Sequence, residues 1–280
     1  MIQPRFAIIV MLRGVVIPEL VSDAALFPED DLPAPPPEHP FRQVRRDGYV
    51  VGLFPGQTLG NVAVRALEPD AVEQTVEEVR RLLADDGKSR GAWMIAEAAS
   101  PAGLAERLQE CGMIPFEGQP LEPRFAAMAI VAPPEGDAGV EARPPQSFEE
   151  FQASARVGFD VFGVPDQDRA AHEVQERRLW ELQLQGIALR SFVALVDDEV
   201  VGGAAVILGA NAGFLAGGYT RPDMRGRGVY RALVRARWDT VVEAGTPALT
   251  VSAGRMSRPI LERLGFHTVG WIDCLLDDFG

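Results

Sequence analysis

The sequence predicts an α/β fold with a mixed sheet (α+β type), arranged as two tandem domains of similar design. Three observations support this. Proline-rich segments interrupt the chain, one of them near its middle. The predicted order strand, helix, strand, helix, strand occurs twice. The chain has 280 residues, 47% of them hydrophobic, which is enough for one large domain or for two.

The domain boundaries follow from the prolines. Residues 33–40 hold five prolines, and residues 133–147 hold four prolines and two glycines. The second segment is typical of an interdomain linker. We therefore expect domains at 1–132 and 147–280, joined by a linker at 133–146.

Hydrophobic spacing after the linker predicts two helices followed by a sheet. The expected elements are helices at 147–158 and 167–186, strands at 192–196, 200–208 and 213–220, a helix at 228–244, a strand at 248–253, a helix at 257–264 and a strand at 266–276. Asp197 and Asp198 are expected at a hairpin turn, although such turns prefer Asn-Gly or Asp-Gly.

The first half has a fainter copy of this pattern. A strand at 61–66, a helix at 70–84, a strand at 93–97 and a helix that starts near Pro101 are expected. The link between the first strand and helix, residues 67–70, has two acids and neither Gly nor Arg. Because acids repel phosphate, we expect no phosphate site in this copy.

Charge and composition exclude several functions. The formal net charge is −13, which argues against general binding to nucleic acid or to an anionic membrane. Two cysteines and three scattered histidines, His39, His172 and His267, match no disulfide framework and no metal spacing. The early apolar run at 6–12 is too short to span a bilayer. We expect a cytoplasmic protein without a metal.

One segment stands out against the acidic background. Residues 221–237 contain six arginines and one aspartate, a net charge of +5. Within it, residues 225–228 read Arg-Gly-Arg-Gly between a predicted strand and a predicted helix. Free N–H groups at a helix N-terminus bind anions, so this turn predicts a pyrophosphate site. A Rossmann site is rejected because position 231 is Arg and strand 248–253 has no acid.

This turn resembles motif A of the GNAT superfamily of acyl-CoA N-acyltransferases, Gln/Arg-x-x-Gly-x-Gly/Ala, with Arg225 first and Gly228 fourth. Strand 249–253 followed by Ile-Leu-Glu-Arg-Leu-Gly-Phe at 260–266 resembles motif B. The resemblance covers about residues 140–280. The first half resembles the degenerate leading domain of tandem GNAT proteins.

The resemblance implies acetyl-CoA as co-substrate and a sheet that opens at strand 213–220. It implies that N–H groups of 226–230 hold the pyrophosphate and that the main chain near 219–220 binds the pantetheine amides. The cofactor-binding residues it implies are Tyr219, Thr220, Arg225, Gly226, Arg227, Gly228, Val229 and Tyr230.

Three positions depart from the family pattern. Tyr230 replaces Gly or Ala at the end of motif A, Gly254 replaces a common Asn, and Leu261 replaces the Tyr that often protonates the leaving thiolate. The catalytic residues are therefore unknown. The candidates are Tyr219 and Ser257, with a water relay or an acid from the helical region 159–176 as alternatives.

The first functional hypothesis is an N-acetyltransferase that transfers an acetyl group from acetyl-CoA to a primary amine of a small molecule or peptide. The acidic chain favours a cationic acceptor such as a polyamine, an amino sugar or a basic peptide terminus. Nucleic acid and membrane partners are not expected, and a homodimer is left open. The second hypothesis is an inactive acyl-CoA-binding sensor or scaffold. The third is a tandem fold without a ligand, against which the positive segment argues.

Overall fold

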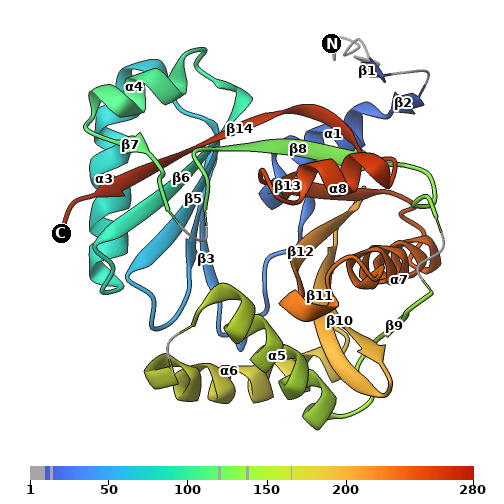
Figure 1. Ribbon diagram of the computed structural model, residues 1–280. Coiled ribbons are helices and arrows are strands. Elements are labelled where there is room, and N and C mark those ends of the chain that lie inside the picture. The colour runs from blue at the N-terminus through green and yellow to red at the C-terminus, as the bar shows by residue number, and fades with distance from the viewer. Residues whose placement is uncertain (1–9, 13–14, 119–120, 137–138, 165) are drawn as a thin grey trace.

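The computed structural model describes residues 10–12, 15–118, 121–136, 139–164 and 166–280. Its main feature is one continuous mixed sheet that runs through both halves of the chain (Figure 1). Among the described residues the strand order in this sheet is β3-β4-β5-β6-β14-β8-β13-β12-β11-β10-β9, and β7 pairs with β14. The predicted α/β class with a mixed sheet is confirmed, and both halves show the expected order of strands and helices.

The elements of the first half are the short hairpin β1 (Val10–Leu12) and β2 (Val15–Ile17), α1 (Glu19–Leu26), α2 (Pro28–Asp31), β3 (Arg42–Arg46), β4 (Tyr49–Leu53), β5 (Leu59–Ala66), α3 (Val72–Asp85), β6 (Arg90–Ser100), α4 (Leu104–Glu110), β7 (Ile114–Pro115) and β8 (Arg124–Ile130). Helix α3 has four buried valines and leucines on one face, spaced for a helix that covers a sheet: Val72, Val76, Val79 and Leu83.

The elements of the second half are β9 (Glu141–Arg143), α5 (Phe148–Phe162), α6 (Asp166–Leu184), β10 (Leu189–Val196), β11 (Glu199–Leu208), β12 (Gly213–Thr220), α7 (Val229–Glu243), β13 (Leu249–Ala253), α8 (Arg258–Arg263) and β14 (His267–Asp278). Every helix and strand expected after the linker is present. The expected hairpin turn is also present, with Asp197 and Asp198 both left-handed at φ 51° and 62°. This conformation gives the turn the twist that the strands need, despite the absence of glycine.

Strand β9 lies inside the segment predicted as a linker. It pairs with β10 through Arg143 and Val193 and forms an edge of the sheet. The strand is short because Pro144 and Pro145 follow it and cannot donate to a ladder. The domain boundaries themselves stay a prediction.

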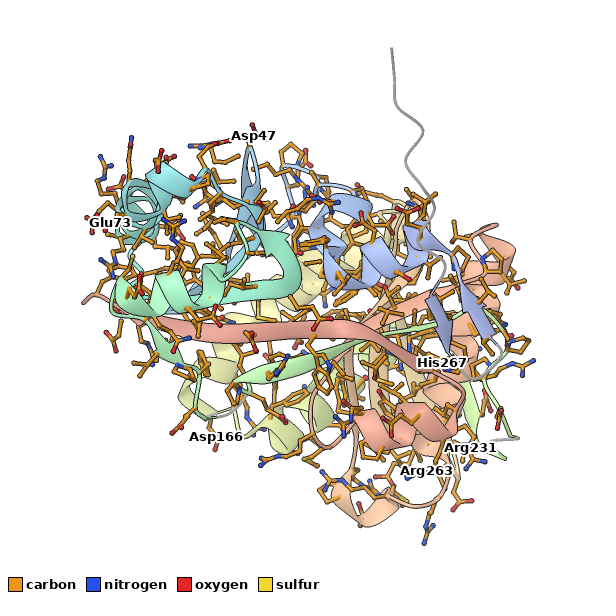
Figure 2. The ribbon with its side chains drawn as sticks, turned by 90° about the horizontal axis from the view of Figure 1, so that it is seen from above. Asp47, Glu73, Asp166, Arg231, Arg263 and His267 are labelled. Atoms are coloured by element: carbon orange, nitrogen blue, oxygen red, sulfur yellow. The ribbon has the colours of Figure 1, made fainter. Side chains whose placement is uncertain are left out.

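The two halves exchange strands at the centre of the sheet. Strand β8 of the first half lies between β13 and β14 of the second. Strand β14 pairs with β8 along its first part, His267↔Ala129 to Asp273↔Arg124, and with β6 along its second part, Ile272↔Ala96 to Asp278↔Arg90. From above, β14 crosses the molecule with Asp47 and Glu73 on one side and Arg231 and Arg263 on the other (Figure 2).

Strand β8 also separates two hydrophobic cores. Its side chains alternate in direction, as in any strand. Phe125, Ala127 and Ala129 belong to the first core, while Ala126, Met128 and Ile130 belong to the second. Helix α1 packs against β8, β13 and β14, so it covers the exchanged strands. Neither half has a complete sheet without the other.

None of the helices in the described ranges is both long enough and apolar enough to cross a bilayer.

A buried ion pair attaches the C-terminal strand to the first half. Arg80 of α3 donates to both carboxylate oxygens of Asp277, with N–O distances of 2.7 and 3.0 Å, and Asp277 is 1% exposed. Because this bidentate pair holds the far end of β14 against α3, Asp277→Ala should lower the free energy of unfolding by about 2–3 kcal/mol in urea denaturation. Asp278→Ala, an exposed neighbour, should change it by less than about 0.5 kcal/mol. Equal effects of the two variants would contradict this role.

Candidate functional site

The sheet of the second half opens between β12 and β13. These parallel strands pair only at Gly213↔Leu249 and Phe214↔Thr250, although β12 continues to Thr220. On its other edge β13 stays paired with β8 as far as Ala253↔Ala126. The opening is therefore confined to one side of β13. The free edge of β12 offers N–H and C=O groups to an extended ligand, as an edge strand does.

A β-bulge at Gly217 coincides with the opening. Gly218 pairs with Ala204 and Ala216 pairs with Ala205, so Gly217 is the extra residue. Its φ of +44° lies in the left-handed region, which suits glycine. A bulge bends the strand that carries it, and here β12 leaves β13 just before this point.

Arg237 lies beneath the bulge and is 1% exposed. Its Nη1 donates to the Ala205 carbonyl at 3.2 Å, and its Nε donates to the Leu233 carbonyl of its own helix at 2.9 Å. Nη2 has no hydrogen-bond partner among the described residues, and burial lowers the pKa of this guanidinium. A buried arginine that bonds the carbonyl beside the bulge holds the strand in its bent form.

The turn between β12 and α7 has the form of an anion site. Gly226 and Gly228 have φ of +79° and +87°, and Gly228 is the N-cap of α7. The first helical bond runs from the Ala232 N–H to the Gly228 carbonyl. In the described part of the chain, the N–H groups of residues 226–230 have no acceptor. Five free donors at the positive end of a helix form a cradle for a phosphate group.

Fewer arginines of the positive segment 221–237 can bind an anion than the sequence indicates. Arg237 is buried in the core, and Arg221 is paired with Glu199 and Asp223. Arg235 is paired with Asp239 at 3.1 Å. Arg225 and Arg227 remain exposed on the turn itself, and Arg225 has no ion pair in the ranges described. Two of the six arginines thus lie where a phosphate on the cradle would need them.

The corresponding strands of the first half do not open. β5 and β6 pair without a break from Leu59↔Arg90 to Val64↔Ile95, and again at Ala66↔Ser100. The link that follows, residues 67–70, is the acidic one noted in the sequence. Within the described ranges, only the second half combines an open pair of strands with an arginine-glycine turn.

The remaining residues implied for the cofactor lie around the opening. Thr220 is 8% exposed, and its buried hydroxyl has no hydrogen-bond partner in the part of the chain that is described. Val229 is 1% exposed, so its N–H alone can meet a ligand. The ring of Tyr230 packs over Gly218, where a Cβ would come within 2.9 Å of it. The large side chain at this motif position therefore lies against β12, which accepts it because residue 218 is glycine.

Ser257 and Leu261, at the start of α8 and within it, contribute to the turn and to the core. The Ser257 hydroxyl donates to the Gly254 carbonyl at 3.3 Å and closes the turn that starts α8. Leu261 is fully buried in the second core. These two residues therefore offer packing and turn closure at this end of β13.

Tyr219 lies on the opposite face of the sheet from Tyr230, under helix α5. Its hydroxyl shares a hydrogen bond of 3.0 Å with the Ser154 hydroxyl. Gly203 and Gly158 make room for this pair, because a Cβ at either position would come within 3.0 Å or less of the Tyr219 ring or hydroxyl. Burial raises the pKa of Tyr219, the Ser154 hydrogen bond lowers it, and the charge of Glu176 raises it further. At neutral pH Tyr219 is a hydroxyl that can donate a hydrogen bond.

Glu176 of α6 is the most perturbed carboxyl group of this region, and it was not among the candidate residues from the sequence. It is 9% exposed, and its Oε2 has no hydrogen-bond partner among the described residues. Burial raises its pKa to about 7, the charge of Glu173 contributes in the same direction, and Arg156 opposes them. Its position on a highly charged helix gives no sequence signal of burial. Glu176 lies at the end of the helical region 159–176, which the sequence analysis gave as an alternative source of a catalytic acid.

Comparisons with known proteins agree with this geometry. Residues 158–266 match the model of the acetyltransferase (GNAT) family. A GCN5-related N-acetyltransferase from Kribbella flavida has a similar structure, with a TM-score of 0.67, 20% identity, and coverage of 93% of this chain and 96% of that one. A GCN5-related N-acetyltransferase from Sphaerobacter thermophilus has a TM-score of 0.56 at 17% identity, with coverage of 83% and 81%.

A tandem GNAT protein from the clavulanic acid biosynthesis pathway is similar over nearly the full length, with a TM-score of 0.59, 13% identity, and coverage of 92% of this chain and 94% of that one. Because these sequence identities are 20% or lower, the similarity to the three structures concerns the fold alone. A search of curated proteins found no match. Residues 158–266 thus match an acetyltransferase (GNAT) domain, and this family supports acyl transfer in general.

The buried carboxyl group of Glu176 should make folding stability depend on pH. Its folded pKa, about 7, lies above the ordinary value of 4.5, so the folded state holds an extra proton between these limits. Its contribution is therefore most favourable below pH 4.5 and is lost as pH rises through 7. From pH 5 to pH 8, Glu176→Gln should gain stability relative to the wild type, by up to about 3 kcal/mol. Denaturant unfolding at each pH measures this.

Glu181→Gln on the same helix, where the side chain is 49% exposed, is the matched control and should run parallel to the wild type. A Glu176→Gln variant that also runs parallel to the wild type would show that the carboxyl group is solvated.

Proposed function

We propose that this protein is an acetyl-CoA-dependent N-acetyltransferase that acylates a primary amine of a small molecule or peptide. The observation that carries the proposal is the alignment of two features on β12. Its edge is unpaired beyond Phe214, and the turn at its end presents N–H groups of residues 226–230 that have no acceptor among the described residues. An extended amide chain that ends in a pyrophosphate matches both features.

In this proposal the pyrophosphate of acetyl-CoA binds the N–H groups of the turn, and Arg225 and Arg227 add charge-assisted hydrogen bonds. The pantetheine amides bind the main chain of β12 near Tyr219 and Thr220. The thioester then lies toward the bulge, where a free N–H of β12 can stabilise the negative charge on the carbonyl oxygen during attack. Much of the rate enhancement would come from holding the thioester and amine in position.

An inactive acyl-CoA-binding protein is the second candidate, and one observation favours it. Leu261, at the position of the family's usual proton donor, is fully buried, and the nearby Ser257 hydroxyl is occupied by the Gly254 carbonyl. Such a protein would bind acetyl-CoA but release no CoA in the presence of amines. A product assay by mass spectrometry across a panel of amines separates the two candidates.

A cytoplasmic location is part of the proposal and rests on the cysteines. Both are free thiols, and burial raises the pKa of Cys274 to about 12. A thiol of this kind is inert and needs no disulfide partner.

Charge reversal on the turn tests the site directly. Arg225→Glu should weaken acetyl-CoA binding by at least about tenfold in isothermal titration calorimetry, because one charge-assisted bond is replaced by repulsion. Arg81→Glu makes the same charge change on an exposed part of α3 and should bind as the wild type does. A wild-type protein that does not bind acetyl-CoA, or two variants with equal affinity, would overturn the proposed site.

A further inference from the structure

Glu176 is a buried acid that does not belong to the proposed cofactor site. A carboxyl group that is 9% exposed normally has a cation or several donors around it, yet Oε2 of Glu176 has none among the described residues. Charges near it are Glu173 on its own helix and Arg156 on α5, and the Tyr219 hydroxyl of β12 is close enough to respond to its charge. Glu173 and Arg156 lie 3.9 Å apart and partly satisfy each other.

Helices α5 and α6 orient Glu176 toward the sheet. On α5, Ser154 and Gly158 form the buried face against β11 and β12. On α6, Trp180 lies one helical turn after Glu176, on the same face, and its ring lies 5.6 Å from the ring of Phe151 on α5. The carboxyl group is therefore directed between the helices and β12, on the face that carries Tyr219.

An exposed aromatic ring lies at the edge of the same region. Phe162, at the end of α5, is 53% exposed, and its ring meets the Tyr219 ring edge-on at 5.8 Å. One side of this ring is buried against Tyr219, and the remainder faces solvent. An exposed ring beside a buried acid matches an amine with an apolar substituent: the ring contacts the substituent and the carboxylate attracts the ammonium group.

We propose that the acceptor is a primary amine on an alkyl or arylalkyl group, that the group packs on Phe162, and that Glu176 takes the proton of the ammonium form. This inference rests on the proposed function, because it places the amine on the α5 side of the same opening. It narrows the acceptor from the broad cationic class that the net charge favours to an apolar amine.

Acetyl transfer from the thioester to the amine involves two proton transfers. The ammonium group gives one proton to the Glu176 carboxylate, and the neutral nitrogen attacks the thioester carbon. The carbon–sulfur bond then breaks, and the second nitrogen proton passes to the thiolate, so that CoA leaves as a thiol. Glu176 returns its proton to solvent. A base with a pKa near 7 is suited to this role at neutral pH.

The first test measures acetyl transfer to 2-phenylethylamine. Glu176→Gln should lower kcat/KM about 100-fold or more at pH 7 and leave acetyl-CoA affinity unchanged in calorimetry. In the wild type, kcat should rise with pH through an apparent pKa near 7, and this inflection should be absent in Glu176→Gln. Glu176→Asp should restore part of the rate and the inflection. Glu181→Gln is the control and should match the wild type.

The second test compares acceptors. The wild type should prefer 2-phenylethylamine and hexylamine over spermidine and glucosamine by about tenfold or more in kcat/KM. Phe162→Ala, a change at a half-exposed ring, should remove most of this preference. A preference for spermidine or glucosamine would overturn the assignment of the acceptor class.

The outcomes separate this inference from the proposed function. If the wild type binds acetyl-CoA and acetylates amines while Glu176→Gln keeps full activity and the same pH profile, Glu176 is not the base and the proposed function stands. If the wild type does not bind acetyl-CoA, both are overturned.

Discussion

The opening between β12 and β13 is the constraint on which the site depends. Parallel strands normally pair along their length, and here pairing stops after Phe214 and Thr250. The bulge at Gly217 and the buried Arg237 accompany this break, since the guanidinium bonds the Ala205 carbonyl opposite the bulge. A buried cation with an unpaired nitrogen costs stability, so its presence here is best understood through the strand geometry that it maintains.

The exchanged strands explain why only one side of β13 is free. β8 from the first half pairs with β13 along the edge that faces away from β12, and this pairing holds β13 in the sheet. β14 then continues from the second half to pair with β6. A second link lies at Asp31 of α2, whose carboxylate accepts from Asn211 and the Ala212 N–H in the β11–β12 turn. The first half, whose own β5 and β6 remain closed, thus supports the open strands of the second.

The sequence predicts most of what is local. The helices and strands after the linker follow from hydrophobic spacing, and the turn at 225–228 follows from its glycines and arginines. The strand exchange could not be predicted, because it depends on contacts between residues such as Ile272 and Ala96 that are far apart in the chain. Arg237 counts as a surface charge in the sequence, since nothing local marks it as buried.

Glu176 illustrates the same limit at the site. Helix α6 is rich in charged residues, so spacing alone does not distinguish Glu176 as a buried carboxyl group. The close packing of α5 over Tyr219 depends on the glycines at 158 and 203, and Glu176 is buried near Tyr219. The proposed cofactor-binding turn can therefore be predicted from a short motif, whereas the proposed acceptor side depends on packing between elements.

Hydrogen exchange of the backbone amides, measured with and without acetyl-CoA, shows whether the co-substrate binds along the opening. Acetyl-CoA should slow exchange at residues 226–230 and at those amides of residues 215–220 that face the opening, because these amides gain acceptors, while residues 59–66 of the closed first-half strand should be unchanged. Protection of the turn together with the free edge of β12 would place the co-substrate along the opening. Protection confined to the first half, or no change in either segment, would show that acetyl-CoA does not bind along the opening.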